Sequence, residues 1–167
     1  MTQTQSRSRT FTWGDPSVTA ALAGRRPGLD LLRAMGDGEL PPPPILALID
    51  IERMAADDGR VTFWLRPQEF HYNPIGSVHG GVIATMLDSA AGCSVHSTLP
   101  AGVGYTTLDL SIKYLRPVTM RSGLLRAEGS VLSKGRRTAL AEARLLDEGD
   151  ALLAHATSSC LLFDMPQ

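Results

Sequence analysis

The stretch from Gly80 to Ser97 constrains the fold more than any other part of the chain. Its apolar residues recur at the 3.6-residue period of an α-helix, at Val82, Ile83, Met86, Leu87, Ala90, Ala91 and Val95. A helix this apolar must be buried against another layer of structure. On both sides of it the sequence changes to patterns typical of β-strands. The sequence therefore predicts one long helix packed on a sheet.

The strands and turns predict an antiparallel sheet and an α+β fold. Two strands are expected before the helix, over Ile45 to Met54 and Arg60 to Arg66, joined at an Asp58-Gly59 turn. After the helix we expect a four-strand meander over Tyr105 to Leu115, Gly123 to Leu132, Arg137 to Leu146 and Ala151 to Phe163. The first of these four alternates, with Leu108, Leu110, Ile112 and Tyr114 on one face and Thr107, Asp109, Ser111 and Lys113 on the other. The order of strands in the sheet stays open.

The chain divides into an N-terminal extension, residues 1–44, and a folded domain, residues 45–167. Residues 1 to about 27 are polar, so we expect part of the extension to be disordered. A short helix is predicted at Gly28 to Met35, followed by the four prolines of Pro41 to Pro44, which stop it. With 167 residues and 43% hydrophobic content, the rest is expected to form one compact domain.

Charge and cysteine content exclude several classes of partner. Lys and Arg number 16 against 17 for Asp and Glu, so the formal charge of -1 favours neither nucleic acid nor an anionic membrane. The N-terminus lacks the apolar core of a signal peptide, and no stretch is long and apolar enough for a membrane span. Cys93 and Cys160 lack the spacing of a zinc site or a disulfide scaffold. We expect a cytoplasmic protein with reduced thiols and no metal.

Asp88 is the most unusual residue of the predicted helix. Between His71 and Ile112 the only Asp, Glu, Lys or Arg residues are Asp88 and Asp109, so no cation at helical spacing neutralises it. Burying an unpaired carboxylate costs several kcal/mol or raises its pKa. The small neighbours Ala84, Ala91 and Gly92 leave room beside it for a substrate or water. Two interpretations remain open: a catalytic acid, or a tolerated one that faces solvent or bonds a backbone amide.

The segment before the helix offers hydrogen-bond donors to an oxyanion. The first N–H groups of a helix have no intrahelical partner, and the helix dipole adds positive charge there. In His79-Gly80-Gly81 the glycines let a ligand approach the backbone closely. Asn73 and His79 add side-chain donors. A flexible loop with ordinary turn chemistry is the alternative.

The spacing of these two features has a consequence for assembly. His79 and Asp88 are nine positions apart, which on a helix is about 180° of rotation and roughly 13 Å of rise. One chain therefore cannot bring both to one carbonyl. If they share a site, a two-fold homodimer is the minimal unit, with one group from each chain.

Four motifs follow one another along the chain: Asn73 to Gly81, Asp88, Tyr105-Thr106-Thr107 and Tyr114-Leu115-Arg116-Pro117. Together they strongly resemble the PaaI-type hotdog-fold acyl-CoA thioesterases, over residues 45 to 163. The resemblance implies a sheet wrapped around the helix and a hydrolase acting on acyl-CoA. Asp88 would be nucleophile or general base, and the Gly80 N–H would polarise the thioester carbonyl. Asn73 and His79 would orient that carbonyl, and Thr107, or Thr106 after a one-residue slip, would orient water.

The resemblance also implies a homotetramer built from two dimers, and no cofactor, because CoA is part of the substrate. Lys134, Arg136 and Arg137 fall where similar proteins place basic residues near the CoA phosphates, although a solvated turn also explains them. The resemblance does not define the role of the N-terminal extension. One expectation is that the extension covers the acyl pocket. The acyl group and the packing of the tetramer stay open.

Two other functions fit parts of the sequence. A hotdog dehydratase or hydratase of hydroxyacyl or enoyl thioesters also uses a loop histidine and a helix acid, but carries a segment rich in Phe and Pro after the histidine, where this chain has Gly80-Gly81. A non-catalytic acyl-CoA-binding protein would keep the fold without turnover, and Asp88 argues against it.

Overall fold

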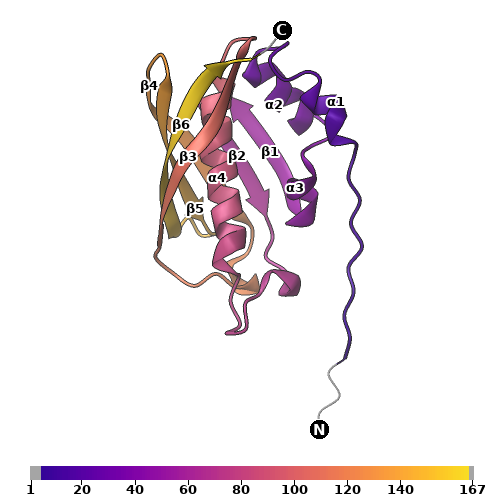
Figure 1. Cartoon of the computed structure of the whole chain (residues 1–167). Coiled ribbons are helices and arrows are strands. Elements are labelled where there is room, and N and C mark those ends of the chain that lie inside the picture. The colour runs from indigo at the N-terminus through magenta and orange to yellow at the C-terminus, as the bar shows by residue number, and fades with distance from the viewer. Residues whose placement is uncertain (1–4, 166–167) are drawn as a thin grey trace.

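The computed structural model of the chain describes residues 5–165, which contain one six-stranded antiparallel sheet and a long helix packed against it (Figure 1). The strands are β1 (Ile51–Asp57), β2 (Arg60–Leu65), β3 (Val103–Tyr114), β4 (Leu125–Lys134), β5 (Thr138–Leu146) and β6 (Leu152–Asp164). Their order in the sheet is β1-β2-β4-β5-β6-β3. The long helix, α4 (Gly80–Ser97), has the bounds that its apolar period predicts. The hotdog arrangement of an α+β fold is confirmed.

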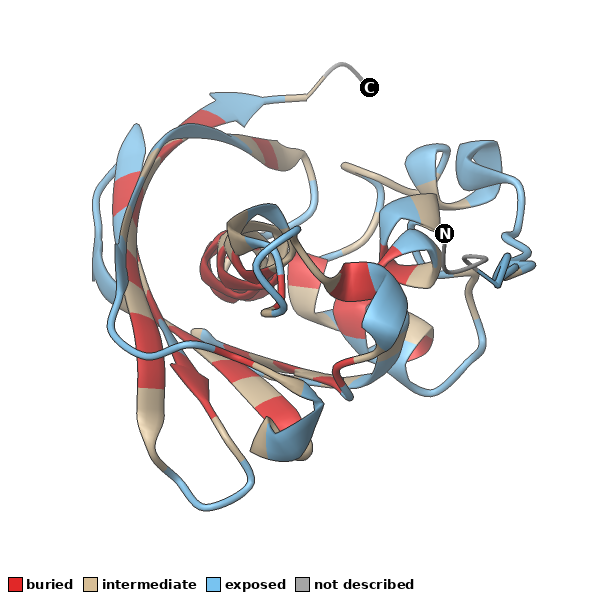
Figure 2. Cartoon of the chain, turned by 90° about the horizontal axis from the view of Figure 1, so that it is seen from below, coloured by how far each residue is buried: buried red, intermediate tan, exposed pale blue. Residues whose placement is uncertain are grey.

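The sheet curves around α4 and buries it (Figure 2). The fully buried residues of the helix include Met86, Leu87, Ala90, Ala91 and Val95, which pack on apolar side chains of the strands. At β4 the approach is so close that a Cβ on Gly129 would lie 2.0 Å from the carbonyl oxygen of Ala90. Only glycine fits there, so this contact fixes how deep the helix lies in the sheet.

The prediction of a strand from Ile45 is wrong for its first part. Residues Pro44–Leu48 form a short helix, α3, and the strand begins only at Ile51. Pro44 stands at the first helical position, where its fixed φ favours a helix and its missing N–H costs nothing. Asp50, with φ of 63°, then turns the chain into β1.

The four-strand meander is also wrong in one respect. Three strands, β4, β5 and β6, follow one another, but β3 lies at the far edge beside β6, and β4 pairs with β2 instead. The connection from β3 to β4 holds Pro117 and the 3-10 turn η2 (Met120–Ser122), so it is too long for a hairpin. One edge of the sheet is therefore the long strand β3.

A β-bulge at Leu108 breaks the alternation expected along β3. Thr107 pairs with Cys160 and Asp109 pairs with the next residue, Ser159, so Leu108 has no partner and is 58% exposed. The extra residue changes which side chains point toward α4. Before the bulge these are the odd-numbered Tyr105 and Thr107, which line a cavity beside the helix, and after it they are the even-numbered Leu110 and Ile112, which pack on the core. Leu108 therefore does not share a face with Leu110.

Contacts to β6 hold this bulge. The Asp109 carboxylate accepts a hydrogen bond of 3.2 Å from the Ser159 N–H. The buried Ser158 hydroxyl donates to the Asp109 carbonyl oxygen at 2.9 Å. Backbone groups that the bulge removes from the regular ladder thus gain side-chain partners.

The N-terminal extension folds against the domain (Figure 1). It holds α1 (Pro16–Ala20), which the sequence did not predict, and α2 (Gly28–Gly36), which confirms the predicted helix. The Gly28 N–H donates to the Leu99 carbonyl at 3.0 Å, and a Cβ on Gly28 would lie 1.9 Å from the His96 carbonyl oxygen. Glycine therefore lets the start of α2 touch the end of α4. The part of the predicted disorder that covers residues 1–4 lies outside the described residues.

His71 closes the turn η1 (Glu69–His71) and is only 3% exposed. Its Nδ1 accepts from the Gln68 N–H at 3.0 Å, so Nε2 carries the hydrogen and donates to the Ile49 carbonyl at 3.0 Å. Burial is the main cause that lowers the pKa of His71. The neutral ring therefore links the loop before α4 to the end of α3.

We expect acid to destabilise the protein through this residue. Because the pKa of His71 is lowered on folding, the unfolded chain binds the proton more readily, and stability is lost as pH falls through the unfolded pKa of about 6.5. Urea unfolding between pH 7.5 and 5 should show His71→Gln to be less stable than wild type at pH 7.5. Its pH dependence should be shallower by up to about 1.4 kcal/mol per pH unit. An unchanged slope would contradict this role.

Candidate active site

Asp88 lies in the middle of α4 and is half-buried. The Thr107 hydroxyl of β3 donates to its Oδ1 at 3.1 Å. Thr107, and not Thr106, is thus the residue that reaches the carboxylate, because the bulge at Leu108 comes directly after it. Among the described residues no Lys, Arg or His forms an ion pair with Asp88. A fixed carboxylate without a cation partner can accept a proton from a bound water.

Asp88 and Thr107 open into a cavity of about 200 Å³, the Asp88 cavity. Its other lining residues are Ser89, Cys93 and Tyr105 and the apolar Leu32, Met35, Pro43, Ile45, Leu46, Met54 and Phe63. The first three of these apolar residues belong to the N-terminal extension. Sequence reasoning did not find them, because a polar and proline-rich segment gives no local signal of a binding wall. A polar end and apolar walls suit a ligand that is polar at one end only.

The other acids of the Asp88 cavity are held neutral. Burial raises the pKa of Cys93 to about 12. Burial is also the main cause that raises the pKa of Tyr105 well above its usual value. Neither group ionises near pH 7, so Cys93 cannot act as a thiolate nucleophile. Asp88 is left as the group of this cavity that can serve as base.

The N-terminus of α4 presents one free donor. The Gly81 N–H donates to His79 Nδ1 at 2.9 Å, and the Val82 N–H to the His79 carbonyl at 3.0 Å. The Gly80 N–H has no hydrogen-bond partner within residues 5–165. It is therefore available to an external acceptor, with the helix dipole behind it.

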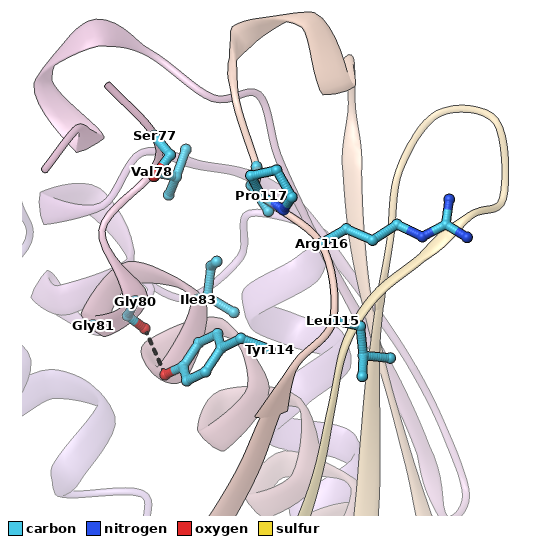
Figure 3. Close-up of a pocket in the computed structure, with 10 residues that line it drawn as sticks. Ser77, Val78, Gly80, Gly81, Ile83, Tyr114, Leu115, Arg116 and Pro117 are labelled. Atoms are coloured by element: carbon cyan, nitrogen blue, oxygen red, sulfur yellow. Dashed lines mark hydrogen bonds between the residues drawn. The ribbon is translucent and has the colours of Figure 1, made fainter. Parts of the chain in front are cut away.

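Gly80 lines a groove of about 550 Å³, the Gly80 groove, together with Ser77, Val78, Gly81, Ile83, Tyr114, Leu115, Arg116, Pro117 and Val118. The Tyr114 hydroxyl donates to the Gly80 carbonyl at 3.1 Å, and Figure 3 shows the ring pointing at that turn. Tyr114 thus ties the end of β3 to the start of α4. Sequence reasoning gave Tyr114 and Arg116 no role, although both lie in the Tyr114 to Pro117 motif.

Asn73 organises the loop before the helix. Its Oδ1 accepts from the Ile75 and Ser77 N–H groups at 3.0 and 3.2 Å, and its Nδ2 donates to the Ser77 hydroxyl at 3.0 Å. The side chain of Asn73 is thereby engaged within its own loop. The exposed His79 accepts through Nδ1, so its Nε2 carries the hydrogen and can donate.

The structure does not bring Asp88 and Gly80 together within one chain. The Asp88 cavity and the Gly80 groove share no lining residue. Gly80 and Asp88 are eight positions apart along α4, a rise of about 12 Å. A single carbonyl cannot contact both in one chain.

Of the three predicted CoA-binding cations, two line one groove and the third does not. Arg136 and Arg137 line a groove of about 520 Å³ with Val103, Leu162, Phe163 and Asp164. The Lys134 ammonium instead donates to the Thr98 carbonyl at 2.7 Å. The three therefore do not form one cluster around a groove.

Within residues 5–165 no helix has the length and apolar character that crossing a membrane requires.

Comparison with known proteins decides the family. The sequence model of the Thioesterase superfamily matches residues 75–154. The Escherichia coli K12 protein named medium/long-chain acyl-CoA thioesterase YigI is 30% identical over an alignment of 127 residues that covers 68% of this chain and 81% of that protein. The chain belongs to the thioesterase superfamily. This confirms the family that its motifs resemble.

Solved structures agree with the assignment of this chain to the thioesterase superfamily. A phenylacetic acid degradation-related protein from Ralstonia eutropha JMP134 superposes with a TM-score of 0.70 at 30% identity, covering 78% of this chain and 98% of that one. The Escherichia coli PaaI protein shares the fold with a TM-score of 0.65 at 18% identity, over 74% and 86% of the two chains. A Halobacterium salinarum relative is 39% identical over 84 residues, but the match spans only 49% of this chain and 54% of that protein.

Proposed function

We propose that the protein hydrolyses acyl-CoA thioesters to a carboxylic acid and CoA. The observation that carries the proposal is Asp88, a carboxylate without a cation, which accepts a hydrogen bond from Thr107 in a cavity whose other walls are mostly apolar. An acyl-CoA has the matching chemistry, with a polar thioester attached to an apolar chain. The name of the Escherichia coli relative supports this substrate class. So does a Streptococcus mutans structure bound to acetyl CoA, with a TM-score of 0.61 at 26% identity over 68% of this chain and 90% of that one.

The residues suit a general-base or nucleophilic hydrolysis. Asp88 removes a proton from water as the water oxygen attacks the thioester carbon, or attacks that carbon itself and is released by water in a second step. Thr107 fixes the orientation of the carboxylate. The Gly80 N–H donates to the carbonyl oxygen as it becomes negative. The C–S bond then breaks, and the CoA sulfur leaves as thiolate and is protonated to the thiol.

A homodimer is the smallest unit that completes this site. Strand β3 is a twelve-residue edge whose outer N–H and C=O groups have no partner strand among the described residues. Leu108, Tyr114 and Leu115 at this edge are exposed by 58, 52 and 54%. Long edges with apolar side chains pair readily with a second copy. We propose that β3 pairing brings Asp88 of one chain to Gly80 of the partner, and that two dimers form a tetramer.

Other parts of the proposal concern CoA and the compartment. Arg136 and Arg137, which share a groove, are our candidates for contacts to the CoA phosphates. Lys134 is the weaker candidate because its ammonium is engaged by the Thr98 carbonyl. The free thiols Cys93 and Cys160 favour a reducing location such as the cytoplasm.

A panel of saturated acyl-CoAs and phenylacetyl-CoA tests the function. We expect release of free CoA thiol with kcat/KM of about 10⁴ M⁻¹s⁻¹ or more on the best substrate. Enoyl-CoA is included, and its product is followed separately from thiol. Addition of water to enoyl-CoA without thiol release would favour the hydratase instead. Binding of acyl-CoA without any conversion would leave the non-catalytic function.

A further inference from the structure

Three side chains separate the Asp88 cavity from a second cavity. The second one, of about 240 Å³, is lined by Met35, Gly36, Pro42, Leu46, Ala47, Ile51, Glu52, Arg53 and Met54. Met35, Leu46 and Met54 line both cavities. They come from three different elements, α2, α3 and β1. We call these three residues the partition.

The chemistry of the Asp88 cavity gives it a direction. Asp88 and Thr107 mark the polar end, where a thioester carbonyl must lie to be hydrolysed. The partition is wholly apolar, so it suits the end of an acyl chain and not the carbonyl. A substrate with its carbonyl at Asp88 therefore extends its acyl group toward the partition.

The size of the Asp88 cavity limits what fits in front of the partition. A dry apolar cavity of about 150 Å³ holds a benzene ring. At about 200 Å³, the Asp88 cavity has room for roughly six to eight carbon atoms. The second cavity would more than double that room if the two were joined.

Contacts of the helices α2 and α3 hold Met35 and Leu46 of the partition in place. Gly28 seats the first turn of α2 on the last turn of α4, and Leu32 on the inner face of α2 is only 2% exposed. The Arg9 guanidinium donates to the Leu48 and Ala47 carbonyls at 2.7 and 3.0 Å, which anchors the end of α3. Met35 and Leu46 are therefore carried by docked helices and not by a free tail.

We propose that Met35, Leu46 and Met54 form the floor of the acyl pocket and set the upper limit of acyl length, at roughly six to eight carbons or a phenylacetyl group. This inference rests on the proposed thioesterase function and assigns a role to the N-terminal extension. Two of the three floor residues come from helices that precede β1. Met35 of the extension and Leu46 of α3 then add a wall to the substrate site that the hotdog sheet alone does not supply.

Truncating the floor tests this inference. Met35→Ala joins the two cavities, so we expect the acyl length of highest kcat/KM on saturated acyl-CoAs to increase by roughly four carbons or more. Met35→Phe fills the cavity and should shift the optimum to shorter chains. Met54→Ala opens the same floor from β1, so it replaces Met35→Ala if that variant fails to fold.

Leu31→Ala is the matched control. Leu31 lies on α2 and is 1% exposed, but lines neither cavity, so this truncation loosens the helix without opening the floor. Its length optimum should equal that of wild type. If Met35→Ala and Met54→Ala are both active and keep the wild-type optimum of acyl length, the proposal that these residues form the floor is wrong. The same shift in Leu31→Ala would overturn it too. Absence of thiol release by wild type on every acyl-CoA would instead overturn the thioesterase function itself.

Discussion

Replacing Asp88 by Asn is expected to lower kcat on acyl-CoA by roughly 10² to 10⁴. The amide has the shape of the carboxylate and its oxygen can still accept from Thr107, but it has no useful basicity or nucleophilicity. Loss of activity would therefore report the chemistry of the group and not its packing. Thiol release at saturating acyl-CoA measures the effect, with thermal unfolding to show that the fold is kept.

The control for this variant is Asp30→Asn, which makes the same change at an exposed position of the helix α2. It should leave kcat within about twofold of wild type, since surface substitutions of this kind usually change little. An Asp88→Asn protein that keeps more than about a tenth of wild-type kcat would exclude Asp88 as the base or nucleophile.

The part of the fold that could be predicted is the part that local pattern determines. Helix α4 is buried along much of its length, so its apolar period locates it in the sequence, from Gly80 to about Ser97. The Asp58-Gly59 turn was also predicted, and Gly59 adopts φ of 72° between β1 and β2. In both cases the sequence signal lies within a short stretch of the chain.

The bulge in β3 could not be predicted, because its partners lie on β6. Ser158 and Ser159 provide the side-chain and backbone bonds to Asp109 that hold the extra residue. The bulge in turn decides that Thr107 and not Thr106 meets Asp88. A choice between neighbouring threonines in the site thus depends on residues about 50 positions away.

The residues of the candidate site also divide into those that could be predicted from the sequence and those that could not. Asp88 stands out in the sequence because it is a charge in an apolar helix, and Gly80 because helix N-termini carry free donors. The partition could not be found, since Met35, Leu46 and Met54 follow no common period and meet only when α2 and α3 dock beside β1. Arrangement in space, and not composition, makes these residues part of one wall.

Replacing Gly80 by Pro is expected to lower kcat by roughly 10² to 10³, the cost of removing one oxyanion donor. Proline deletes the N–H that has no partner within the described part of the chain. Gly80 is the first residue of α4, where proline is well tolerated. The backbone of His79, with φ of -61° and ψ of 135°, already has the conformation that a following proline requires. The fold should therefore survive while the donor is lost.

Gly80→Ala separates the donor from the side chain. A Cβ at this position would lie 3.4 Å from the Tyr114 ring, an ordinary contact, and the N–H is kept. Alanine should retain most of the wild-type kcat in the same thiol assay, with melting temperatures close to wild type for both variants. Equal losses in alanine and proline would show that bulk near Tyr114, and not the missing hydrogen bond, lowers the rate.

Mixing the Gly80→Pro and Asp88→Asn chains then tests whether sites are shared. If each site takes Asp88 from one chain and Gly80 from its partner, a hybrid dimer has one site with both substitutions and one intact site. Random exchange makes half of the dimers hybrid, so about a quarter of wild-type activity should return from two nearly inactive proteins. Exchange is verified by purification through two different tags. If verified hybrids recover no activity, Asp88 and Gly80 do not act in a site shared between two chains. That result would contradict the proposal drawn from the separation of the Asp88 cavity and the Gly80 groove.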